Sequence, residues 1–382
     1  MTQSGPPKVL LLGDSGAGKT SFLAALDYYI MVSPRRIKLD DTYSLRIFGQ
    51  SKSDDFPIFP QSADGYGPRT DVYNTLRREE YQTRFKIKLL RDQEEVSVKG
   101  VDLTFVDNRG GGIFEAFMNA RPARMKANYP ELTDDIDTSQ SIIVFVNLVD
   151  YVYRKYMVPQ MYAAQVGQIH LTENPFRAGP MLHIQGILDF LASYFEQEGV
   201  RNKRILLVGT KMDALDALVR FYKEDRQLDK AQLPPGLQAL LGEDGRLSLP
   251  RLKDALVRDI EEVNDGRLDL LCLLLTTFCA NTSTNQQFSI HHAPGQVVGS
   301  LGTSHTISRL QEVNITNALL LSVIADGRFF FPSLSVHSNK AAQAIRRTFW
   351  EQQHEPIRRA WNQYVGRVQG QTISHFFGAS GR

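Results

Sequence analysis

Residues 10–22 read LLLGDSGAGKTSF, an apolar run that ends in a glycine-rich turn and continues into Lys-Thr-Ser. The eight residues from Gly13 to Thr20 fit the pattern G-x-x-x-x-G-K-[ST], in which a strand passes through a phosphate-binding turn into a helix. The segment therefore predicts an α/β fold in which a buried strand leads directly to a helix N-terminus. The alternative is a chance GKT in an ordinary glycine-rich turn, and the placement between a strand and a helix disfavours it.

This segment, called the P-loop, is expected to bind phosphate mainly through its backbone. Successive N–H groups from Ser15 to Lys19 would point inward and form an anion-binding nest at the start of the helix. The Lys19 ammonium would reach the β- and γ-phosphates, and the Thr20 hydroxyl would ligate Mg²⁺. The predicted phosphate-binding residues are Gly13, Asp14, Ser15, Gly16, Ala17, Gly18, Lys19, Thr20 and Ser21.

The hydrophobic pattern predicts a doubly wound, mostly parallel sheet. Continuously apolar runs are typical of strands buried on both faces, and they occur at 8–12, 141–149, 204–209 and 269–278. Two further runs, at 81–92 and 96–107, are separated by a short polar stretch and predict a hairpin that adds one antiparallel strand. Helical patterns lie between the strands, at 20–29, 183–199 and 248–263.

Residues 1–335 are expected to form one domain, with insertions at about 31–79, 150–182 and 282–315. Residues 336–382 would add a C-terminal extension, with a helix from about 341 to 368 interrupted near Pro356. This helix is basic and aromatic. Either it forms a docking or nucleic-acid surface, or it packs on the domain through its aromatic side chains, which we favour. The residues concerned are Arg346, Arg347, Arg358, Arg359, Arg367, Phe349, Trp350 and Trp361.

The composition restricts the classes of partner. The net charge of +2 gives no overall basic field, so nucleic-acid binding is not implied. Cys272 and Cys279 lie in or beside an apolar run and are expected to be reduced thiols. The N-terminus lacks a signal-peptide pattern, and the longest apolar runs are too short to span a bilayer. We expect a cytoplasmic protein without a membrane segment.

A second motif, Asp107-Asn-Arg-Gly110, follows the second hairpin strand. A carboxylate at Asp107 can hold Mg²⁺ through water, and the Gly110 N–H can contact a γ-phosphate. The alternative is an Asx-capped turn, which is common by chance. The position after an apolar strand, and after the P-loop in the chain, favours the phosphate site.

A third motif places Thr210, Lys211 and Asp213 directly after a buried strand. The Asp213 carboxylate could accept two hydrogen bonds from guanine N1 and its exocyclic amine, and adenine would leave the carboxylate unpaired. The Lys211 stem would lie along the base. The alternative is that Asp213 caps the helix that follows.

Taken together, GDSGAGKT, DNRG and TKMD resemble the P-loop GTPases of the translation-factor and Ras-like (TRAFAC) class, and TKMD is similar to the guanine motif of Rho-type small GTPases. The resemblance covers about residues 8–283 and is thin outside the motifs. It implies that the chain binds GTP and GDP with Mg²⁺. It also implies switch regions that reorder with the γ-phosphate, and a protein partner or a dimer contacted through the switch regions and insertions.

The same resemblance implies two further features of the site, a guanine-contacting loop and a switch I threonine. Ala280 and Asn281 fill the place of the loop that offers a backbone N–H to the guanine oxygen. The switch I threonine, a Mg²⁺ ligand near the reacting phosphate, should precede the first hairpin strand. Thr83 is slightly favoured there over Thr70.

One departure from the family bears on hydrolysis. Ras-like members carry a water-orienting glutamine directly after D-x-x-G, and this chain has Gly111 followed by Gly112. Arg109 could stabilise charge on the γ-phosphate, or it is simply solvated. We therefore expect a GTP-binding switch that hydrolyses GTP slowly or with a partner's help. The alternatives are a P-loop ATPase or kinase, and a guanine-nucleotide-binding module without efficient turnover.

Overall fold

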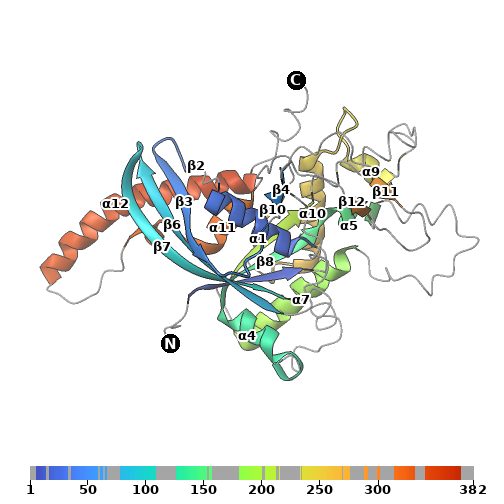
Figure 1. Cartoon of the computed structure of the whole chain (residues 1–382), viewed down its shortest axis with the longest axis horizontal. Coiled ribbons are helices and arrows are strands. Elements are labelled where there is room, and N and C mark those ends of the chain that lie inside the picture. Colours follow the sequence, from blue (N-terminus) through green and yellow to red (C-terminus); the bar gives the residue numbers. More distant parts are fainter. Residues whose placement is uncertain are drawn as a thin grey trace, which may run out of the picture.

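The computed structural model is organised around one twisted sheet of eight strands, in the order β10-β9-β8-β1-β7-β6-β3-β2 (Figure 1). The structure describes residues 6–13, 17–32, 36–58, 61–62, 65–66, 78–108, 126–152, 155–156, 180–199, 203–211, 215, 233, 235–268, 270–275, 288–290, 299–301, 314–331 and 340–370.

The first half of the sheet is parallel, as the apolar runs predict. Neighbouring strands from β10 to β7 all pair in parallel. Their bounds are β1 Lys8–Gly13, β7 Glu94–Asp107, β8 Ser139–Asn147, β9 Arg204–Thr210 and β10 Leu270–Leu275. β8 ends at Asn147, two residues earlier than expected, because helix α5 (Leu148–Val152) begins there.

The second half is antiparallel and larger than the sequence indicates. The predicted hairpin is present: β6 (Glu79–Arg91) pairs with β7 along its length. Asp92 and Gln93 close the hairpin with φ values of 47° and 77°, as a two-residue hairpin turn requires.

The sheet then continues through β3 (Tyr43–Lys52) and β2 (Arg36–Lys38), which pair antiparallel, so the expectation of a single antiparallel strand is wrong. Both strands come from the stretch 31–79, expected to be an insertion. Tyr43, Leu45 and Ile47 alternate with more polar residues and are buried, which is the period of a half-buried strand.

The remaining elements are mostly helices that cover the two faces of the sheet. Their bounds are α1 Lys19–Asp27, a π-helical turn Tyr28–Val32, α4 Pro130–Thr138, α7 Pro180–Glu198, α9 Pro235–Leu240, α10 Leu249–Asn264, α11 Ile315–Val323, a 3₁₀ turn Gly327–Phe330 and α12 Lys340–Gly370. Four short strands form two separate ribbons: β4 Gln61–Ser62 with β5 Gly65–Tyr66, and β11 Phe288–Ile290 with β12 Gly299–Leu301.

β1 separates two hydrophobic cores. Val9 and Leu11 belong to the core that includes residues of α1, α11 and α12. Leu10 and Leu12 belong to the core that includes residues of α4, α7 and α10. Because successive side chains of a strand point to opposite faces, one apolar strand serves both cores.

α12 runs alongside the antiparallel strands (Figure 1) and contributes Ile357, Trp361 and Tyr364 to the first core. This agrees with the favoured interpretation of a helix packed through its apolar side. The expected interruption is absent, because Pro356 lies inside one continuous helix. A proline removes one backbone donor from a helix, yet α12 continues beyond Pro356, where Ile357, Trp361 and Tyr364 are buried.

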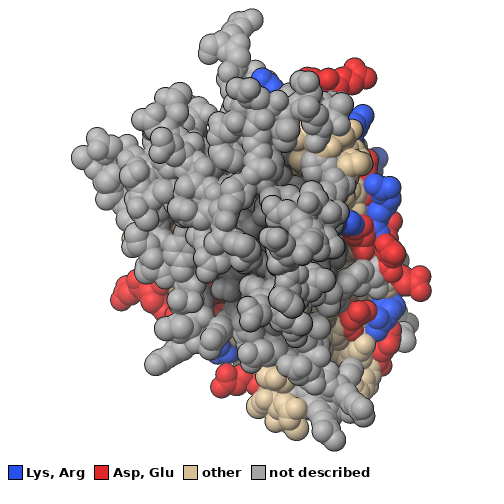
Figure 2. All heavy atoms as spheres, turned by 90° about the vertical axis from the view of Figure 1, so that its right-hand side faces the viewer, with Lys and Arg blue, Asp and Glu red and all other residues tan. Residues whose placement is uncertain are grey.

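The described parts of the other expected insertions are small, and the domain boundary at residue 335 stays a prediction. Among the described helices, none is long and apolar enough to cross a bilayer. The face in Figure 2 shows described basic and acidic side chains intermixed rather than gathered by sign.

Candidate functional site

The P-loop lies between β1, which ends at Gly13, and α1, which begins at Lys19. Gly18 has φ of 93°, a conformation that L side chains rarely adopt. A Cβ on Gly13 would lie 3.0 Å from both the Cβ and the carbonyl oxygen of Phe145 on β8. Both glycines are therefore required by the local backbone. Asp14, Ser15 and Gly16 lie outside the described residues.

Lys19 and Thr20 converge with Asp107, the last residue of β7. The Thr20 hydroxyl donates to Asp107 Oδ2 at 2.8 Å. The Lys19 ammonium donates to the Gly13 carbonyl at 3.0 Å and lies 3.9 Å from Asp107 Oδ1. The three residues come together because β1 and β7 are parallel neighbours, with Leu11 opposite Asp107. The structure thus unites the first two sequence motifs.

Asp107 is a fully buried carboxylate whose Oδ1 has no hydrogen-bond partner. Burial raises the pKa of Asp107, and the Lys19 charge and the Thr20 hydroxyl oppose that shift in part. A buried anionic oxygen without a hydrogen-bond donor is costly, and the Lys19 ammonium at 3.9 Å offsets that cost only in part. A Mg²⁺ ion would relieve this cost, and the Thr20 hydroxyl and the Asp107 carboxylate are the oxygen ligands it prefers.

Within the described residues, no cluster of three or more His, Cys, Asp or Glu side chains is arranged to hold a metal. Such a cluster is not needed for Mg²⁺ at a phosphate site. Mg²⁺ there usually keeps several waters and takes one or two protein ligands together with phosphate oxygens. The residues present fit that mode.

Thr210, at the end of β9, lies beneath the P-loop. Its hydroxyl donates to the carbonyl oxygen of Ala17 at 2.7 Å and lies 3.2 Å from that of Val146 on β8. Thr210 is 1% exposed, and a Cβ on Gly18 would be 3.6 Å from its side chain. The third motif therefore begins directly against the first, a contact that the sequence does not reveal. Lys211 follows with a left-handed backbone, φ 62°.

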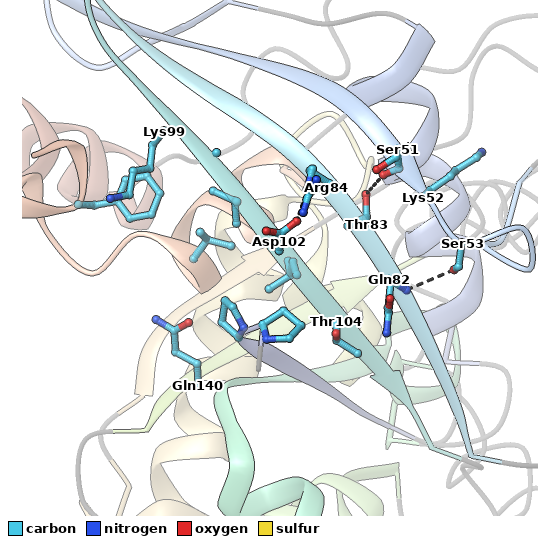
Figure 3. A pocket seen from close by; sticks show the side chains of 17 residues that line it. Ser51, Lys52, Ser53, Gln82, Thr83, Arg84, Lys99, Asp102, Thr104 and Gln140 are labelled. Atoms are coloured by element: carbon cyan, nitrogen blue, oxygen red, sulfur yellow. Dashed lines mark hydrogen bonds and ion pairs between the residues drawn. The ribbon is translucent and has the colours of Figure 1, made fainter. Parts of the chain in front are cut away.

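Thr83 is not brought to this site. It lies inside β6, opposite Leu103, and donates to the Ser51 carbonyl on β3 at 3.4 Å (Figure 3). Glu79, not Thr83, pairs with Asp107. Thr83 is four residues further along the strand than Glu79, which at about 3.3 Å per residue places it about 13 Å from Glu79. The interpretation of Thr83 as a Mg²⁺ ligand does not fit, because Thr83 lies in the interior of β6 rather than before the strand.

Thr83 instead lines an open cavity of about 950 Å³ over β6 and β7, away from the P-loop. Figure 3 shows Gln82, Arg84, Asp102 and Thr104 along the same strands. Several other predicted residues cannot be placed. Thr70, Arg109, Gly110, Gly111, Gly112, Asp213, Ala280 and Asn281 lie outside the described residues.

The sequence patterns miss a group of residues beside Asp107. Asp135 on α4 is fully buried, and it accepts hydrogen bonds from Arg78 and from Asn108. Asp135 is 57 residues from Arg78. No local periodicity could have indicated this pairing, and α4 itself is absent from the helices expected.

A scan against protein-family models finds no match, and a search of curated proteins also finds none. Among solved structures, the chain is similar to the signal recognition particle receptor SRb-GTP/SRX complex from Chaetomium thermophilum. The identity is 15% and the TM-score is 0.29, over 72% of this chain and 92% of that one.

Proposed function

We propose that the chain binds GTP and GDP with Mg²⁺ at the P-loop, hydrolyses GTP slowly and acts as a nucleotide-dependent switch for a protein partner. The observation that carries the proposal is the convergence of Lys19 and Thr20 on Asp107, whose Oδ1 is buried without a hydrogen-bond partner. The approach of a cation to this carboxylate would offset its burial, and a bound triphosphate would bring that cation.

The residues of the site have distinct tasks. The Lys19 ammonium, buried and fixed by the Gly13 carbonyl, would neutralise β- and γ-phosphate oxygens. The hydroxyl of Thr20 would turn its oxygen toward the metal, and Asp107 would hold the metal's water shell. Bound Mg²⁺ would supply charge neutralisation at the β- and γ-phosphates. The P-loop backbone would fix the phosphate chain at the start of α1.

Guanine selectivity is proposed from the third motif. The Thr210 hydroxyl, at the end of β9, is hydrogen-bonded to the P-loop carbonyl of Ala17, so the chain leaves β9 through Lys211 next to the P-loop. Asp213, two residues beyond Lys211, would then pair with the guanine edge, which adenine cannot match. Asp213→Asn should weaken GTP binding and admit xanthine nucleotides. Unchanged GTP affinity in this variant would remove the guanine assignment.

Slow turnover is proposed from the residues after Asp107. Gly111 and Gly112 provide no side chain to orient an attacking water, and Arg109, within the second motif, would be a further cation that could stabilise charge on the γ-phosphate. Fast phosphate release by the isolated chain would contradict this part of the proposal. A complete lack of turnover with tight binding would favour the guanine-nucleotide-binding module.

The deciding experiment is titration of the chain with fluorescent GTP, GDP and ATP analogues, with Mg²⁺ and with EDTA. Lys19→Ala should abolish tight triphosphate binding, and Thr20→Val should reduce the effect of Mg²⁺. Lys86→Ala, at an exposed position of β6, and Thr138→Ala, at a half-buried position at the end of α4, are the matched controls and should bind as the wild type does. Equal or stronger ATP binding would replace the GTPase proposal with an ATPase or a kinase.

A further inference from the structure

A buried carboxylate outside the motifs lies next to the proposed site. Asp135, on α4, accepts two hydrogen bonds from the Arg78 guanidinium, from Nε to Oδ2 and from Nη2 to Oδ1, both at 2.6 Å. Two parallel bonds of this kind form the bidentate fork that fixes both position and orientation. The Asn108 amide donates a further bond to Asp135 Oδ2 at 3.3 Å.

The two donors lie opposite each other, one register position beyond the last pair of the antiparallel strands β6 and β7. Arg78 directly precedes β6, whose first residue Glu79 pairs with Asp107. Asn108 directly follows Asp107. Asp135 therefore binds Arg78, which precedes Glu79, and Asn108, which follows Asp107. One side chain of α4 therefore holds the start of β6 and the end of β7 together, directly next to Asp107.

The group formed by Asp135, Arg78 and Asn108, called the junction below, lies where two further stretches of chain join the described strands. Residues 67–77 lead into Arg78, and residues 109–125 continue from Asn108; both stretches lie outside the described residues. Arg78 also donates to Glu80, whose carboxylate lies 3.4 Å from the Lys8 ammonium of β1. The junction is thus tied to the strand that leads into the P-loop.

We propose that Asp135 is a positioning residue for the Mg²⁺ end of the nucleotide site, which keeps Asp107 directed at Lys19 and Thr20 by fixing Arg78 and Asn108. This inference rests on the proposed function. Asp135 does not touch the nucleotide or the metal; it acts through Asp107. Its effect should therefore be confined to binding that involves the cation. A residue that merely supports the fold would affect binding with and without Mg²⁺ alike.

The test compares Asp135→Asn with Asp137→Asn. Asp137 lies on the same helix, two residues away, and accepts a hydrogen bond from Tyr194 at 2.7 Å, away from Asp107. Wild type and both variants are titrated with a fluorescent GTP analogue, in Mg²⁺ and in EDTA. Asp135→Asn should weaken binding about tenfold or more in Mg²⁺ and less than about twofold in EDTA, a difference of about 1.4 kcal/mol for each factor of ten. Asp137→Asn should change neither value.

Two further variants keep the test decisive if Asp135→Asn folds poorly. Arg78→Lys keeps the charge and loses the fork, so it should show a smaller loss that again depends on Mg²⁺. The double variant Arg78→Gln with Asp135→Asn places two amides opposite each other and leaves no unpaired buried charge. It should regain part of the binding lost in Asp135→Asn. Equal losses in Mg²⁺ and EDTA, or no loss in any variant, would overturn the proposal.

A second measurement needs no nucleotide. Hydrogen–deuterium exchange of the nucleotide-free chain should be faster at the Glu79–Asp107 pairing in Asp135→Asn, and unchanged there in Asp137→Asn. If exchange at this pairing is the same in all three proteins, Asp135 does not hold Asp107. Wild-type protein that binds neither GTP nor GDP would instead refute the proposed function, and the exchange result would still decide the role of Asp135 in holding the strand end.

Discussion

Thr210→Val is the sharpest probe of the contact between the third motif and the P-loop. Valine has nearly the shape of threonine, so the change removes the hydroxyl without leaving a cavity. The hydroxyl is buried and lies 2.7 Å from the Ala17 carbonyl and 3.2 Å from that of Val146. Valine leaves both carbonyls facing a methyl group.

The magnitude follows from two costs. A buried carbonyl that loses its partner costs about 1–3 kcal/mol. A carbon atom also approaches a carbonyl oxygen only to roughly 3.3 Å, so the 2.7 Å contact with the P-loop has to lengthen by about half an ångström or more. We expect the free energy of unfolding to fall by about 2 kcal/mol. If about half of this cost falls on the P-loop geometry, GTP affinity should drop roughly fivefold, at 1.4 kcal/mol per factor of ten.

The assays are urea unfolding for stability and titration with a fluorescent GTP analogue for affinity. Thr210→Ser is the matched control, because it keeps the hydroxyl and loses one methyl group. It should cost about 1 kcal/mol of stability and leave the affinity unchanged. Wild-type stability in Thr210→Val, or an equal loss of GTP affinity in Thr210→Ser, would show that the Ala17 hydrogen bond does not support the P-loop.

Three further outcomes are expected. Gly18→Ala should destabilise the chain by about 1–2 kcal/mol, because the backbone of Gly18 has a φ of 93°. Gly100→Ala, on a strand with open space around the Cα, should not destabilise it, and equal urea midpoints for the two variants would contradict this expectation. Trp361→Ala, which removes a fully buried side chain, should cost about 3–5 kcal/mol against less than about 0.5 kcal/mol for the exposed Arg359→Ala. Burial lowers the pKa of His354, so the unfolded chain binds more protons, and stability should decrease as pH falls below about 6.5. His354→Gln should reduce that dependence, and an identical pH profile in the variant would rule out His354 as the titrating group.

The P-loop strand and the hairpin could be predicted from sequence because their signals are local. An apolar run followed by G-x-x-x-x-G-K-T, and two alternating runs joined by a polar turn, each lie within a few residues of chain. The sequence pattern does not predict β3, because the alternation of Tyr43, Leu45 and Ile47 lies in the polar stretch 31–79, which is interpreted as a whole as an insertion. Its pairing with β6 is set by tertiary contacts rather than by local propensity.

The site shows the same contrast between residues that local motifs predict and residues that only tertiary contacts bring together. Thr20 and Asp107 belong to recognisable motifs, and the structure joins them by a hydrogen bond. Thr83 is assigned as the switch I threonine from its position relative to an expected strand boundary, and strand boundaries are the feature that sequence patterns define least well. The structure places Thr83 in the interior of β6, four residues beyond the Glu79–Asp107 pair, rather than before the strand. Asp135 could not be found, because a bond across 57 residues leaves no periodic trace.

The shared core of α1 and α12 also constrains the order of events during synthesis. Phe22, next to the P-loop, belongs to the same buried cluster as Trp361 and Tyr364 of α12. The ribosome makes the first of these residues long before the last two, and chains generally fold from the N-terminal side as they emerge. The phosphate-binding segment is therefore present in the nascent chain well before the α12 side chains that complete this hydrophobic core have been synthesised. It can reach its final packing only after α12 has left the ribosome.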